Sequence, residues 1–181
     1  MPLDDHLVRS VREALAAIPA ADAPDIYAIS FFIYDEDDDP QKPTITIGYN
    51  TESQVKRVLD PAGRDPDPAE ARWNYAWWLQ NKLAVIGDSR SDPDGAAQLT
   101  QWINGTPELR DHPERITTRI VGGCVRLARS IQETGLIDRA IGHQVPVLIH
   151  ELEYYEQIAR QTEAANPSGL ADDFAAWVRN Q

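Results

Sequence analysis

The chain has 181 residues, of which 42% are hydrophobic, and this fits one globular domain over residues 1–181. Its 29 acidic residues outnumber its 17 basic residues, which gives a net charge of −12 at pH 7. Nucleic-acid phosphates and anionic membrane surfaces repel such a chain, so neither is an expected partner, whereas a basic protein is attracted. The single cysteine, Cys124, excludes an intramolecular disulfide and a zinc site made of cysteines.

Hydrophobic periodicity predicts a first helix within residues 3–18, where leucine or valine recurs every fourth position. Two strands are predicted next, over 25–34 and 43–50. An acidic turn joins them, so we expect an antiparallel pair. Thr51, followed three residues later by Gln54, is a helix-capping pattern and predicts a short helix.

The remaining elements are less uniform. The proline-rich residues 60–69 are expected to form an internal loop, and residues 70–81 an aromatic helix. Residues 83–86 are either a third strand or a continuation of that helix, because short apolar runs do not distinguish the two. The C-terminal half is predicted to contain, in chain order, a helix over 96–103, a long helix over 113–134, a strand near 145–149, a helix ending before 166 and a last helix near 174–178.

These elements predict the α+β class, because helices outnumber strands and the strands gather early in the chain. We expect a small antiparallel sheet from the early strands, packed by several helices that include one long helix in the C-terminal half. The N-terminal residues start with acidic side chains, unlike a signal peptide, and no stretch approaches the roughly 18 apolar residues of a membrane span. A cytoplasmic, soluble protein is therefore expected, with its oligomeric state left open.

His150 and Glu151 begin like the zinc-protease motif H-E-x-x-H. That motif needs a second histidine four residues after the first, and Tyr154 occupies this position. No histidine follows His150 in the chain, so neither a metal site nor a cofactor is predicted here. We expect His150 and Glu151 to lie at a junction between a strand and a helix.

Two other stretches carry unusual composition. The acidic residues 35–39 resemble a calcium loop, but Pro40 and Thr46 stand where that loop needs glycine and a bidentate glutamate. A solvated hairpin turn is the simpler interpretation, with weak divalent-ion binding or a docking patch for lysines as the alternatives. In the aromatic helix, Trp73 and Trp77 are four residues apart and are expected to share a face beside Arg72, as core residues or as binding anchors.

The predicted long helix contains Cys124 in its apolar stripe, where a buried and inert thiol is expected. Gly122 and Gly123 precede it inside the helix. Each costs about 1 kcal/mol relative to alanine, so close packing of another element against them is expected.

Three stretches also occur in a familiar order: GYNTE at 48–52, the Arg-Trp helix at 72–78, and IHELEYYEQIARQTEAANP at 149–167. This order resembles the bacterial domain-of-unknown-function family 4303, whose members are single-domain proteins of about this length. Asn74, Tyr75 and Trp77 depart from the Ser-Pro and Glu of the family pattern. The resemblance implies no particular activity. Relatives found near bacterial toxin–immunity genes imply a binding role.

The sequence is therefore consistent with two functions. The first is a non-enzymatic protein-binding module, in the manner of an immunity protein that neutralises a basic toxin domain. The alternative is an enzyme whose site assembles from scattered residues around His150 and Glu151. No catalytic residue is assigned, and the expected binding residues are Asn50, Glu52, Arg72, Trp73, Trp77, His150, Glu151 and Tyr154.

Overall fold

A computed structural model describes residues 2–59 and 66–181, so the first part of the predicted loop 60–69 lies outside the described residues. The centre of the fold is a sheet with the strand order β3-β2-β1-β4. Its strands are β1 (Ile26–Asp35), β2 (Pro43–Thr51), β3 (Ala84–Ile86) and β4 (Val147–His150). Strand β2 pairs antiparallel with both β1 and β3, whereas β4 pairs parallel with β1.

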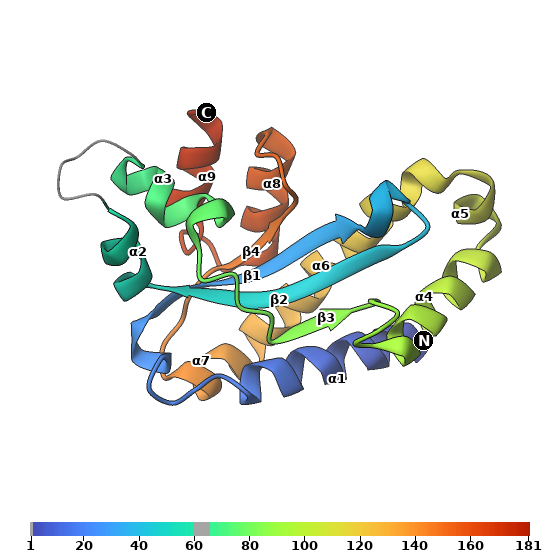
Figure 1. The fold of residues 1–181 in the computed structure, drawn as a ribbon, viewed down its shortest axis with the longest axis horizontal. Coiled ribbons are helices and arrows are strands. Elements are labelled where there is room, and N and C mark those ends of the chain that lie inside the picture. The colour runs from blue at the N-terminus through green and yellow to red at the C-terminus, as the bar shows by residue number, and fades with distance from the viewer. Residues whose placement is uncertain (1, 60–65) are drawn as a thin grey trace.

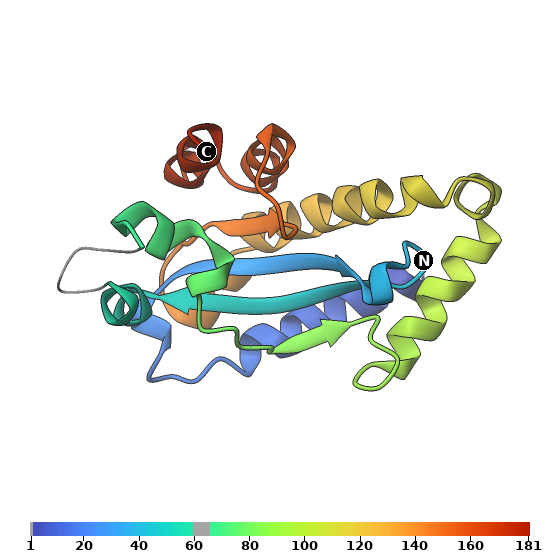
Figure 2. The ribbon, with the colours of Figure 1, turned by 45° about the horizontal axis from the view of Figure 1, so that its top comes forward.

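Helices cover both faces of this sheet, as Figures 1 and 2 show. One hydrophobic core lies between the sheet and the helices α1, α4, α5, α6 and α7. A second core, richer in aromatic side chains, lies between the opposite face and α3, α8 and α9. The helices span Pro2–Ala16 (α1), Glu52–Val58 (α2), Pro68–Trp73 (α3), Pro93–Gly105 (α4), Pro107–Asp111 (α5), Ile116–Glu133 (α6), Leu136–Ile141 (α7), Glu156–Ala165 (α8) and Asp172–Arg179 (α9).

The α+β class and the long helix α6 are confirmed. The sheet, however, is mixed and not wholly antiparallel, because β4 returns to the edge of β1 in the parallel direction. Residues 83–86 contribute the strand β3 and do not continue a helix. The alternation of threonine and isoleucine over residues 44–47 predicts a half-buried strand, but β2 is buried along its whole length, since helices cover both faces of the sheet.

The predicted helix over 70–81 is wrong in its second half. Helix α3 ends at Trp73, and Asn74 has an extended backbone whose side chain accepts a hydrogen bond from the N–H of Ala76. Asparagine competes with a continuous helix through such local bonds. A single 3-10 turn over Tyr75–Trp77 follows. Trp73 is consequently buried whereas Trp77 is exposed, so the two tryptophans do not share a helix face.

Two further expectations need correction. The helical spacing of Leu152 and Tyr155 predicts that the helix ending before 166 includes both, but α8 begins at Glu156, so both residues precede it. Gly122 and Gly123 were expected to receive another element in close packing, but a Cβ atom at either position would meet only the Arg126 side chain of the same helix, at 3.6 Å and 3.9 Å. None of the helices in the described part of the chain is long and apolar enough to cross a membrane.

Candidate functional site

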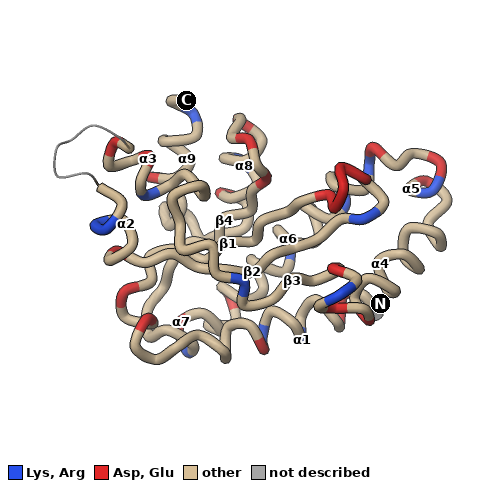
Figure 3. Tube along the Cα trace, in the orientation of Figure 1, with Lys and Arg blue, Asp and Glu red and all other residues tan. Residues whose placement is uncertain are grey.

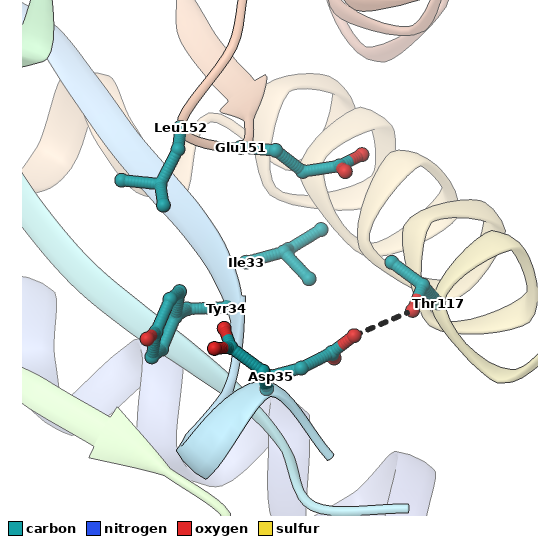
Figure 4. A pocket seen from close by; sticks show the side chains of 7 residues that line it. Ile33, Tyr34, Asp35, Thr117, Glu151 and Leu152 are labelled. Atoms are coloured by element: carbon teal, nitrogen blue, oxygen red, sulfur yellow. Dashed lines mark hydrogen bonds between the residues drawn. The ribbon is translucent and has the colours of Figure 1, made fainter. Parts of the chain in front are cut away.

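The candidate site lies where β1 and β4 end side by side. Phe32 of β1 is aligned with His150 of β4, and side chains alternate between the two faces of a strand. Asp35 lies three residues after Phe32, and Glu151 lies one residue after His150. Both offsets are odd, so these two side chains point to the opposite face, which α6 covers. Figure 4 shows both carboxyl groups extending toward α6, with Ile33 between them.

These side chains line a cavity of about 240 Å³. Its walls come from the end of β1, the turn that follows it, the first turn of α6 and the segment after β4. The lining residues are Ile33, Tyr34, Asp35, Asp38, Thr117, Glu151 and Leu152. The turn between β1 and β2 brings further carboxylates next to the cavity, as the red segment at this end of β1 in Figure 3 shows.

Only one of the two carboxylate oxygens of Asp35 has a hydrogen-bond partner among the described residues. Its Oδ2 accepts a hydrogen bond from the Thr117 hydroxyl at 3.3 Å. Its Oδ1 is buried and has no hydrogen-bond partner among the described residues. Burial raises the pKa of the Asp35 carboxyl, and the negative charges of Asp39 and Asp38 raise it further.

Glu151 shares the same environment. Burial raises the pKa of its carboxyl, and the nearby charge of Asp35 adds to the increase. The Tyr155 hydroxyl, which donates a hydrogen bond to Glu151 Oε1 at 3.3 Å, opposes it. The two carboxyl groups therefore repel each other in a half-buried site, and a cation placed between them would stabilise both charges.

The rim of the cavity is apolar. Tyr34, Leu152 and Tyr155 are large side chains with exposed fractions of 37%, 69% and 46%. Lysine and arginine have an aliphatic stem and a charged end, and the stem packs on apolar surface while the end contacts acids. An acidic cavity with an apolar rim matches that shape. Over residues 2–59 and 66–181, no group of three or more histidine, cysteine, aspartate or glutamate side chains is arranged to hold a metal ion.

Four of the residues expected to bind a partner lie together at the opposite end of β1 and β2. Arg72 donates two hydrogen bonds to Glu52, at 2.9 Å and 2.8 Å, and its guanidinium lies 4.1 Å from the ring centre of Tyr27 and 5.1 Å from that of Trp73. Asn50 is buried and donates to the Tyr27 hydroxyl at 2.9 Å. Their contacts are with one another and with Tyr27 of β1, as in a structural network that joins the sheet to α2 and α3.

His150 lies inside the second core and is only 1% exposed. Its Nε2 is 2.7 Å from the Ser30 hydroxyl, and its ring stacks on Tyr154. Burial lowers the pKa of His150 to about 4, so the ring is neutral at pH 7. Other aromatic rings lie within 6.4 Å of it: those of Phe32, Tyr75 and Trp78.

A serine hydroxyl beside a histidine nitrogen has the geometry of a nucleophile and its base. Ser30 and His150 are both 1% exposed, however, so a substrate cannot contact either of them in this conformation. Trp77 is 37% exposed on the 3-10 turn, and its carbonyl accepts a hydrogen bond from Gln54 at 2.8 Å. Of the eight residues expected to bind, Glu151 alone lines the acidic cavity.

The sequence pattern gives less indication that the other polar residues of the cavity belong to a site. Asp35 belongs to the acidic run 35–39 that was interpreted as a hairpin turn or a lysine-docking patch, and the structure places it at the end of β1. Nothing in the sequence pattern points to Thr117, because its contact with Asp35 joins residues 82 positions apart. Comparison with protein-family models, with curated proteins and with solved structures gives no match.

Proposed function

We propose that this chain is a non-enzymatic, cytoplasmic protein-binding module that binds a basic segment of a partner protein. A lysine or arginine of the partner enters the cavity between Asp35 and Glu151. The observation that carries this proposal is the pair of half-buried carboxyl groups with raised pKa, one of which has an unpartnered oxygen. A bound cation neutralises the repulsion between the two carboxylates and gives the unpartnered oxygen a partner, which makes the contact favourable.

Two features of the surroundings support the same function. The exposed side chains of Tyr34, Leu152 and Tyr155 provide apolar contact area beside the charged centre, and aromatic side chains such as tyrosine are enriched at protein interfaces. The net charge of −12 attracts a basic protein over a distance and speeds its association. The resemblance to family 4303 adds the expectation that the partner is a toxin domain encoded by a neighbouring gene.

The enzymatic alternative has less support. Its central residue His150 is enclosed by aromatic rings, and Glu151 points to the other face of the sheet, toward α6. An acid–base pair needs both groups within hydrogen-bond reach of one substrate, and the sheet separates these two side chains.

The proposal is tested with a hexa-arginine peptide, whose affinity is measured by fluorescence anisotropy at low salt. We expect Asp35→Asn and Glu151→Gln to weaken binding at least tenfold, which corresponds to about 1.4 kcal/mol. Glu133→Gln is the matched control, because it removes one equal charge from an exposed position at the far end of α6.

The two carboxyl variants are expected to fold at least as stably as the natural chain at pH 7, because each removes a charge that burial disfavours. Equal weakening by all three variants would mean that the peptide responds to net charge alone and would contradict the proposed site. Co-expression with the product of a neighbouring toxin gene then tests the nature of the partner.

A further inference from the structure

A second cavity, of about 550 Å³, lies between α1, α4 and α6. Most of its lining is apolar and comes from these three helices and β2: Leu3, Leu7, Ile45, Leu99, Trp102 and Ile120. The aliphatic members of this set are at most 9% exposed, so they line the inside of the fold and not an open face. A volume of this size with a mainly apolar lining is typical of small-molecule sites.

The wall that α6 contributes contains two consecutive glycines between longer side chains. Arg119, Gly122, Gly123 and Arg126 follow the helical spacing of three, four and seven residues, so they lie on one face, and all four line the cavity. Glycine inside a helix destabilises it relative to alanine. A Cβ atom at Gly122 or Gly123 would make only ordinary contacts, so no neighbouring element requires glycine at either position. The two glycines make the cavity deeper, because the cavity reaches the helix backbone where they lack side chains.

The charged groups of this cavity are mainly cationic, although the whole chain is strongly acidic. Arg119 donates a hydrogen bond to Glu108 at 2.8 Å and is therefore paired. Arg126 has no hydrogen bond or ion pair with any residue in the part of the chain that the structure describes. Asp4, in the first turn of α1, contributes one carboxylate to the lining. One unpaired guanidinium beside an apolar cavity matches a ligand with an alkyl chain and a single negative charge.

We propose that this cavity binds a medium-chain carboxylic acid. The alkyl chain lies among Leu7, Leu99 and Trp102, above the glycine backbone of α6, and the carboxylate contacts Arg126. A planar guanidinium pairs with a carboxylate through two parallel hydrogen bonds, which fixes the orientation of the ligand. The site is independent of the acidic cavity proposed to bind a basic partner.

Calorimetric titration with decanoate and with 1-decanol tests the ligand class, since the two molecules differ in the charged head. We expect decanoate to bind at least tenfold more tightly than decanol. Arg126→Gln should remove this preference, whereas Arg12→Gln, the matched loss of an exposed arginine on α1, should leave it unchanged. Equal affinity of the natural chain for the two ligands would overturn the assignment of a carboxylate, and absence of decanoate binding would overturn the site.

The double variant Gly122→Ala/Gly123→Ala separates binding from folding. Alanine favours the helix, so we expect a higher melting temperature together with at least tenfold weaker decanoate binding, because two methyl groups enter the cavity. Gly105→Ala is the matched control, since an added Cβ atom there meets nothing within 4 Å. Natural affinity in the more stable double variant would overturn the role of the glycines.

Discussion

The protonation of His150 is linked to folding. Its imidazole is neutral in the folded chain because burial lowers its pKa from 6.5 to about 4. Protonation would place a charge among aromatic rings, where no described carboxylate pairs with it; its two hydrogen-bond contacts are the Ser30 hydroxyl and the carbonyl of Glu151. The unfolded chain binds this proton at the ordinary pKa, so the two states differ in bound protons between pH 6.5 and pH 4.

The direction of the pH effect follows from this difference. The stabilising contribution is complete above pH 6.5 and is lost as the pH falls toward 4, because the unfolded state binds more protons in that range. The loss due to His150 amounts to about 2 kcal/mol between pH 7 and pH 5. Urea unfolding of the natural chain and of His150→Gln over this range measures it.

We expect the unfolding free energy of His150→Gln to be lower than that of the natural chain at pH 7 and to fall less as the pH is lowered. Ser30→Ala serves as the comparison, because it removes the hydrogen-bond partner and leaves the histidine in its buried position. Parallel pH profiles for the natural chain and His150→Gln would show that this histidine does not set the acid sensitivity.

At the scale of elements, the edge of β4 is closed by side chains of α8 and the residue after it. Asn166 accepts a hydrogen bond from the N–H of Val147 and donates one to its carbonyl, both at 2.8 Å. Thr162 and Gln161 hold the N–H and the carbonyl of Ile149 in the same way, at 3.1 Å and 2.9 Å. An edge strand with free backbone groups is a site of unwanted pairing, and these contacts remove it.

Asn166→Ala is therefore expected to destabilise the fold by about 2 to 4 kcal/mol, because it leaves two buried backbone groups of Val147 unpaired. Chemical denaturation measures the loss. Asn180→Ala removes an exposed asparagine at the end of α9 and should change stability by less than about 0.5 kcal/mol. If the two variants lose the same small amount, the side chain of Asn166 is not what closes this edge.

The elements that sequence periodicity predicts are those whose pattern repeats over many residues. Helices α1 and α6 and strands β1 and β2 each bury an apolar set with regular spacing, and their positions match the predictions. The aromatic segment after α3 does not follow its predicted helix. The Asn74 side chain accepts a hydrogen bond from the N–H of Ala76, and this bond outweighs the helical spacing of the tryptophans. Hydrophobic periodicity is read over a whole helix, so it does not reveal a single local hydrogen bond that ends the helix early.

The candidate site was harder to predict than the fold for a related reason. Asp35, Thr117 and Glu151 come from three segments that meet only because β4 lies parallel to β1 beneath α6. The strand near 145–149 was predicted. Which strand it pairs with, and in which direction, depends on the assembled sheet and not on the local sequence. His150 drew attention by its motif, whereas its neighbour Glu151 lines the cavity, because consecutive residues of a strand face opposite sides.

At the scale of the whole molecule, the excess of acidic residues is an energetic cost of folding. Folding brings 29 carboxylates and 17 cations into a small volume, and the uncompensated charge of −12 repels itself more strongly in the compact state. Exposed ion pairs such as Arg179 with Glu163, at 2.7 Å, contribute little to offset this repulsion. A bound basic partner would reduce the same repulsion, so stability and binding are linked through charge.

Added salt should therefore stabilise the chain at neutral pH. Raising sodium chloride from about 10 mM to about 150 mM shortens the screening length from roughly 30 Å to roughly 8 Å, which weakens repulsion between distant charges more than attraction within close pairs. We expect the melting temperature at pH 7.5 to rise over this range. At pH 4.6, the isoelectric point expected from the sequence, the net charge vanishes and the rise should disappear. A melting temperature that falls with salt at pH 7.5 would mean that close ion pairs, and not the excess of carboxylates, dominate the electrostatics of the fold.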